Sequence, residues 1–170
     1  MRRTRWLSAD EQRTWRAFLD ATQLFFGQID HQLQLQAKMP HAYYEVLVRL
    51  SETPLRRLRM GDLATTSLSS KSRISHAVAR LEEAGWVRRE RSGGDGRGLV
   101  AVLTDSGLAA LRAAAPGHVE QVRAHLFDRL TPAQVAALGE ISEAIAAPLR
   151  AGRSACGDPP CGAERTGDDA

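Results

Sequence analysis

The sequence predicts a mainly α-helical protein with one small β-hairpin. Apolar residues recur at helical spacing over much of residues 9–148, and two of these stretches follow capping signals of the Ser/Thr-x-x-Glu/Gln type. Two short β-prone runs flank a glycine-rich segment at 92–98, which is typical of a hairpin. With 170 residues, of which 43% are hydrophobic, the chain suits one domain of ordinary size.

The first predicted helix begins after Ser8 and reaches about Ala37. The segment Ser8–Glu11 has the form of a capping box. Apolar residues then continue at helical spacing at Leu19, Phe26, Ile29 and Leu33. Their face is wide for a helix that is covered on one side only, so it is either ordinary core or a subunit interface.

The middle of the chain alternates short elements. A helix opened by Pro40 is predicted over 40–51, a very short strand over 57–59, and a short helix over 60–67. Ser70 then N-caps a further helix, which Gly85 ends because glycine tolerates the left-handed conformation found just past a helix. The hairpin strands follow at 86–91 and 99–103.

The order short helix, tight turn, helix and hairpin predicts a winged helix-turn-helix between about Leu55 and Thr104. Thr104 caps a long alanine- and leucine-rich helix, with a kink or break near Pro116. A second capping box at Thr131–Gln134 starts the last helix, which runs to about Pro148. Residues 151–170 contain little apolar surface and are expected to form a disordered tail.

The helix after Ser70 has one apolar and one polar face. At 100° per residue, Ile74, Ala77, Val78 and Leu81 point to the core. Small hydroxyls and long donors lie opposite, at Ser69, Ser72, Arg73, His76 and Arg80. Such a face suits the DNA major groove, where Arg bonds guanine, and Lys71 at its side suits a phosphate. The alternative is a charged face that only meets solvent.

The positive charge of the chain is concentrated in this region. Residues 55–98 hold ten Lys or Arg against five Asp or Glu, whereas the remainder holds thirteen against fifteen. The hairpin adds Arg88, and its loop could insert Arg97 into the minor groove with Asp95 holding the guanidinium. A flexible turn with an incidental ion pair is the alternative for that loop.

Several segments together resemble the MarR-type transcriptional regulators. They are Leu63-Ala64, the helix Ser70–Leu81, Gly85–Arg89, Asp95-x-Arg97 and Leu103-Thr104-x-x-Gly107. The resemblance covers about Leu7 to Leu149. One departure is the turn, which reads Ser67-Leu68-Ser69 where members often have glycine and an apolar residue. Leu68 would then fill the core from a shifted position.

The resemblance implies a single domain over 1–150, with helical dimerisation parts at about 8–38 and 105–150. It implies an obligate homodimer that binds a pseudo-palindromic DNA operator and regulates transcription. Many members are repressors that a small aromatic or phenolic ligand releases. The expected DNA-binding residues are Ser69, Ser70, Lys71, Ser72, Arg73, His76, Arg80, Arg88, Asp95 and Arg97.

Aromatic side chains near the junction of the helical and DNA-binding parts are the candidates for an effector pocket. They are Trp15, Phe18, His41, Tyr43 and Tyr44. An aromatic cluster at helical spacing is also what an ordinary core contains, so both interpretations stand.

Other functional classes have little support in the sequence. Neither a membrane-spanning run nor a secretory signal is present, so we expect a cytoplasmic protein. We expect neither enzyme activity nor a cofactor, because no catalytic constellation or phosphate-binding glycine loop occurs. Cys156 and Cys161 lie in the tail and are too few for a closed zinc site. The rival function is a winged-helix module that binds another protein.

Overall fold

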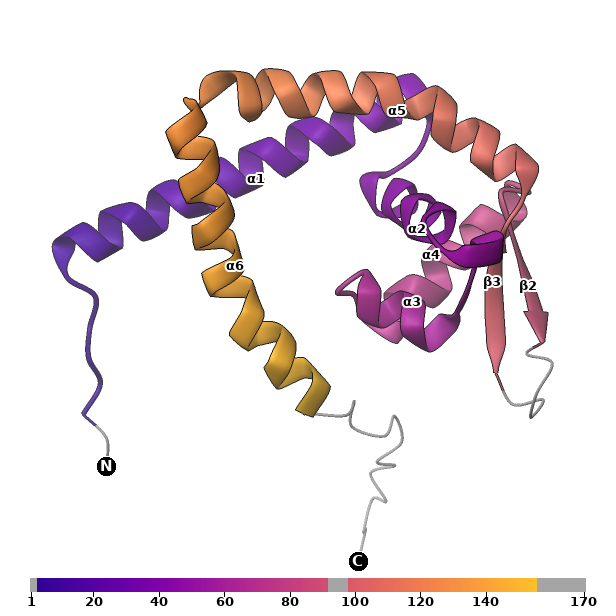
Figure 1. Cartoon of the computed structure of the whole chain (residues 1–170), viewed down its shortest axis with the longest axis horizontal. Coiled ribbons are helices and arrows are strands. Elements are labelled where there is room, and N and C mark those ends of the chain that lie inside the picture. The colour runs from indigo at the N-terminus through magenta and orange to yellow at the C-terminus, as the bar shows by residue number, and fades with distance from the viewer. Residues whose placement is uncertain (1–2, 92–97, 156–170) are drawn as a thin grey trace, which may run out of the picture. The chain divides into compact units, whose positions relative to one another are not determined.

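The structure is a computed structural model that describes residues 3–91 and 98–155. The chain divides into two compact units, Met1–Leu126 and Phe127–Ala170. The first unit contains five of the α-helices and a three-stranded antiparallel sheet, and the second contains the last helix (Figure 1). This is the mainly α-helical fold with a β-hairpin that the sequence predicts.

The first helix, α1 (Ala9–Ala37), begins and ends where the sequence predicts. The capping box is complete, since Ser8 Oγ accepts from the Glu11 amide at 3.2 Å and the Glu11 carboxylate accepts from the Ser8 amide at 2.7 Å. Only its C-terminal part is buried, at Ile29, Gln32 and Leu33. There it lies beside α5 (Asp105–His125), as Figure 1 shows.

Short elements connect α1 to the helix-turn-helix. They are α2 (His41–Ser51), the 3-10 turn η1 (Pro54–Arg56), β1 (Arg57–Arg59) and α3 (Met60–Thr66). The buried residues include Val46, Leu47 and Leu50 of α2 and Leu63 and Ala64 of α3. The predictions for this stretch are confirmed to within one residue.

The next helix, α4 (Lys71–Glu83), leads into the hairpin of β2 (Val87–Arg91) and β3 (Leu99–Leu103). Gly85 makes the turn between helix and strand with φ +73°, a backbone conformation that glycine adopts at little cost. The strand order is β1-β3-β2, with Val87 opposite Leu103 and Arg91 opposite Leu99. The apolar sides of α2, α3 and α4 pack with these strands into one core.

The long helix α5 corrects one expectation. Thr104 caps it as predicted, its Oγ1 accepting from the Gly107 amide at 3.0 Å. The helix is not broken at Pro116 but continues to His125. Proline removes one backbone donor there, and the contact with α1 supports the helix despite that loss.

The second unit consists of the 3-10 turn η2 (Phe127–Arg129) and α6 (Pro132–Ala155). The predicted capping box is present, with the Gln134 side chain accepting from the Thr131 amide at 2.9 Å. α6 passes its expected end at Pro148, so the first five residues of the expected disordered tail are helical. Cys156 and Cys161 lie outside the described residues. No helix in the described chain is long and apolar enough to cross a membrane.

Candidate nucleic-acid interface

The two faces of α4 divide as the helical wheel predicts. Ile74, Ala77, Val78 and Leu81 are buried in the core. Ser72, Arg73, His76 and Arg80 are exposed together on the opposite side, which we call the reading face. Ser70 caps the helix, accepting from the Arg73 amide at 3.3 Å. Lys71 is exposed, while Ser69 is half-buried in the turn.

The turn between α3 and α4 differs from its prediction. Leu68 does not fill the core, because its side chain is 56% exposed. Its backbone is left-handed, with φ +49°, and Leu63 and Ala64 of the preceding helix already occupy the core. Backbone bonds hold the turn, from the Leu68 amide to the Thr65 carbonyl at 3.2 Å and from the Ser69 amide to the Ala64 carbonyl at 3.0 Å.

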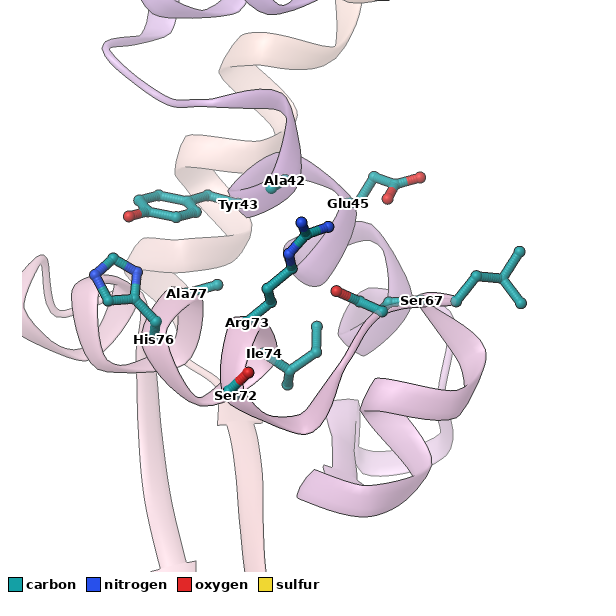
Figure 2. A pocket seen from close by; sticks show the side chains of 11 residues that line it. Ala42, Tyr43, Glu45, Ser67, Ser72, Arg73, Ile74, His76 and Ala77 are labelled. Carbon is teal, nitrogen blue, oxygen red and sulfur yellow. The ribbon is translucent and has the colours of Figure 1, made fainter. Parts of the chain in front are cut away.

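A hollow of about 570 Å³ lies between α2 and the reading face, and we call it the α2–α4 hollow. Figure 2 shows Arg73 extending from α4 into the space between Tyr43 and Glu45 of α2. Its lining also includes His76, Ser72 and the turn residues Ser67, Leu68 and Ser69. The hollow therefore shares several side chains with the expected DNA-binding set.

Carboxylates accompany several of the basic side chains near the reading face. Arg80 Nη1 lies 2.7 Å from a Glu83 carboxylate oxygen. Arg88 pairs with Glu90, which lies two residues further along β2. The hydrogen bond that Arg80 donates to the Glu83 carboxylate raises the pKa of Arg80, so this guanidinium stays charged. Arg73, by contrast, has no carboxylate within ion-pair distance among the described residues.

A charged link joins α4 to the wing strand β2. The Glu82 carboxylate accepts from the Arg89 amide at 3.0 Å and from Arg89 Nε at 2.8 Å. These side-chain and backbone hydrogen bonds lower the pKa of Glu82. The link fixes the first residues of β2 against the end of α4. Asp95 and Arg97, expected at the tip of the wing, lie outside the described residues.

The five candidate effector residues do not gather in one place. Trp15 and Phe18 stack on each other at 6.1 Å on α1, with about half of each side chain exposed. Tyr43 lines the α2–α4 hollow instead. His41 and Tyr44 contact a residue that the sequence did not single out, His118 of α5, at ring distances of 5.9 and 4.4 Å.

His118 is a half-buried residue of α5 that faces α2. Burial lowers the pKa of its imidazole, the nearby His41 lowers it further, and Glu45 opposes the shift. In the described chain, His118 Nδ1 and the buried Gln32 Oε1 have no hydrogen-bond partner. A histidine in an alanine-rich helix gives no sequence signal of this kind, because the side chains around it come from another helix. No cluster of three metal-ligating side chains occurs among the described residues.

Comparison with known proteins identifies the family. A model of the MarR family matches residues 38–98. The crystal structure of Sco3205, a MarR family transcriptional regulator from Streptomyces coelicolor, in complex with DNA, is 53% identical in sequence, with a TM-score of 0.83. That match covers 85% of this chain and 90% of Sco3205. The chain belongs to the MarR family.

Two further structures extend this finding. AbsC, another MarR family regulator from S. coelicolor, is 44% identical with a TM-score of 0.82, and the match covers 87% of this chain and 99% of AbsC. CouR from Rhodococcus jostii, bound to p-coumaroyl-CoA, is 21% identical with a TM-score of 0.67 over 76% of this chain and 89% of CouR, and shows the fold alone. A search of curated proteins found no match.

Membership of the MarR family identifies the motif that the elements of the first unit form. α3 and α4 form the helix-turn-helix, and β2 and β3 form the wing. The resemblance drawn from the sequence motifs is therefore confirmed, as are the mainly α-helical fold and the winged helix-turn-helix. Transcriptional regulation is the function of this family.

Proposed function

We propose that this MarR family protein is a repressor that binds a pseudo-palindromic double-stranded operator as a homodimer. The observation that carries the proposal is the reading face, which presents Ser72, Arg73 and His76 from a capped helix beside the wing. The DNA complex of Sco3205, at 53% identity, supports the same partner. The small β-hairpin and the exposed α4 match the parts with which winged helices contact duplex DNA.

The reading face supplies the chemistry of base recognition. In the proposed complex α4 enters the major groove, where Arg73 bonds the guanine edge and His76 donates to a base acceptor. Ser69, Ser70 and Lys71 at the start of the helix hold the phosphates on its flank. Arg80 and Arg88 would exchange Glu83 and Glu90 for phosphate oxygens. Arg97 with Asp95 would reach the minor groove through the wing.

Exposed apolar side chains support the homodimer. Trp6, Trp15 and Leu24 on or before α1 are 85%, 49% and 75% exposed in the single chain. In α6, Ile141 and Ile145 are 57% and 49% exposed. Soluble monomers seldom expose so many large apolar groups, whereas a partner subunit would cover them. A dimer places two recognition helices about one turn of DNA apart.

Release by a small aromatic or phenolic effector is the second part of the proposal. Of the five candidate residues, Tyr43 lines the α2–α4 hollow, opposite Arg73. An aromatic acid there could stack on the Tyr43 ring and give its carboxylate to the guanidinium. Because Arg73 also belongs to the reading face, such a ligand would compete with DNA. A panel of phenolic acids tests this by displacement of bound DNA.

DNA binding is tested with a duplex selected from a randomised library. If a dimer neutralises about eight phosphates, the logarithm of affinity should fall against the logarithm of the salt concentration with a slope of about −7. Arg73→Ala should relax base preference, whereas Lys71→Ala should weaken binding to all sequences alike. A salt-insensitive complex, or equal losses on selected and random DNA for both variants, would contradict the proposal.

The exposed face of α1 also suits a protein partner, so an interaction module is the second candidate function. Sedimentation separates the two, because the repressor should be a stable dimer at micromolar concentration. A monomer that binds no selected duplex would favour the interaction module.

A further inference from the structure

Leu68 occupies an unusual place for a leucine. It lies directly before the recognition helix, with 56% of its side chain exposed and its backbone left-handed at φ +49°. A residue with a Cβ is strained in this conformation, and an apolar side chain that stays in water contributes no free energy of burial to folding. The fold therefore gains little stability from a leucine at this position.

Three backbone hydrogen bonds hold the turn that carries Leu68. The amides of Ser67, Leu68 and Ser69 donate to the carbonyls of Leu63, Thr65 and Ala64, at 3.0, 3.2 and 3.0 Å. The side chain is thus presented from a fixed frame rather than from a loose loop. A fixed frame lets a small contact discriminate, because little chain entropy is lost when the contact forms.

The surroundings of Leu68 are polar. Its neighbours in the chain are Thr65, Thr66, Ser67, Ser69 and Ser70. It lines the α2–α4 hollow together with Ser72 and Arg73 of the reading face. Among the described residues of the turn and the reading face it is the one large apolar side chain.

We propose that Leu68 is a specificity-determining residue that packs against the methyl group of a thymine in the major groove. The C5-methyl of thymine is the apolar group that the major-groove edges present, and apolar side chains recognise it. Hydroxyls and guanidinium groups on the same surface cannot replace this contact. The inference rests on the proposed DNA binding and adds one base to what α4 reads.

The test removes the methyl group from either partner. The wild-type protein should select thymine at one position in each half-site, and deoxyuridine placed there should weaken binding. Loss of one buried methyl corresponds to about fourfold per half-site, or about fifteenfold for both. Leu68→Gly should lose this discrimination and bind the thymine and deoxyuridine duplexes equally. Leu68→Met should retain it, because methionine keeps an apolar group.

Thermal unfolding separates a reading role from a structural one. Glycine relieves the left-handed strain, so Leu68→Gly should unfold at the same or a higher temperature than the wild type. Deoxyuridine at other thymine positions of the same duplex serves as the control. A lower unfolding temperature, or a thymine preference that Leu68→Gly leaves intact, would overturn the inference. A wild-type protein that selects no duplex at all would instead contradict DNA binding itself.

Discussion

Gly107 stands where the packing leaves no room for a side chain. A Cβ at this position would lie 2.1 Å from the Trp86 carbonyl oxygen and 2.8 Å from Leu103 Cδ1. Trp86 directly precedes the first wing strand β2, and Gly107 lies in the first turn of α5. The absent side chain therefore lets α5 pack directly on the junction between the recognition helix and the wing.

Gly107→Ala should reduce the free energy of unfolding by about 1–3 kcal/mol, since the contact is with backbone that cannot rotate away. Urea denaturation measures this change. Gly61→Ala is the matched control, because a Cβ there has no atom within 4 Å and should leave stability unchanged or slightly higher. Equal effects of both substitutions would show that the close contact is unimportant.

His118 predicts a pH dependence of stability. Burial, and then His41, lowers the pKa of His118 below its ordinary value of 6.5, while Glu45 opposes this. The unfolded chain therefore takes up the proton more readily than the folded chain. As pH falls through about 6.5 the free energy of unfolding should decrease, and the decrease should end once pH is below the folded-state pKa.

Urea denaturation between about pH 7.5 and pH 5 measures this slope. His118→Gln should flatten it, because the group that titrates differently in the two states is gone. His31→Gln, at an exposed histidine of α1, should leave the slope unchanged. Identical slopes in the wild type and His118→Gln would contradict the prediction.

At the scale of elements, a side chain as well as a turn connects α4 to β2. Glu82 near the end of α4 binds both the backbone amide and the guanidinium of Arg89. The direction in which the wing leaves the helix is therefore set by one carboxylate as well as by the turn at Gly85. Two adjacent glutamates in α4 thus differ in role, because Glu83 pairs with Arg80 of the same helix.

Glu82→Gln and Glu83→Gln should change DNA affinity in opposite directions. Removing a negative charge near DNA should by itself strengthen binding. Glu83→Gln also frees Arg80 to contact a phosphate, so the salt dependence of binding by this variant should steepen by about one. Glu82→Gln loosens the wing and should weaken binding by up to about fivefold, because a partly exposed pair contributes about 1 kcal/mol or less. Fluorescence anisotropy measures both. Tighter binding by both variants would show that the link does not orient the wing.

The elements that the sequence predicted well are those with local signals. Caps at Ser8, Ser70 and Thr104 fixed helix starts, because the bonds that make them span three residues. The predictions of a break near Pro116 and of a helix end at about Pro148 were wrong, because whether a helix continues past a proline depends on its whole length and packing.

In the candidate site too, features set by local sequence were predictable and features set by tertiary contacts were not. The polar face of α4 followed from helical periodicity, so its exposed residues were predicted correctly. The pairing of Arg89 with Glu82 was not predictable, because it joins a helix end to a strand through a turn. The position of Leu68 depends on a left-handed backbone that leucine rarely adopts, and residue type argued against it. The contact of His118 with Tyr44 was not predictable, because the sequence does not show which helix faces α2.

At the scale of the whole molecule, the proposed dimer governs function. α6 carries an apolar stripe that includes Ile141, Ile145 and Leu149, all exposed in the single chain. Their spacing of four residues is that of a helix face that packs on another surface. Stability and operator affinity should both depend on protein concentration if that surface belongs to a second copy.

Ile145→Glu should therefore give a monomer by sedimentation and lower operator affinity by more than about a hundredfold, because one half-site must be bound alone. Ala136→Glu is the control, since nine residues at 100° each place it on the opposite side of α6. It should remain a dimer with unchanged affinity. A dimeric Ile145→Glu variant would show that α6 does not form the subunit interface.

The carboxylates beside Arg80, Arg88 and Arg89 have a consequence for how such a protein would find its operator. They act as counterions built into the chain, so fewer mobile ions are released when the protein touches DNA of arbitrary sequence. Contact with random sequence would then be weaker and shorter, while the base contacts proposed for Arg73 would not be reduced. Since a chromosome offers a vast excess of wrong sites, a shorter dwell time on each leaves more protein free to reach the right one.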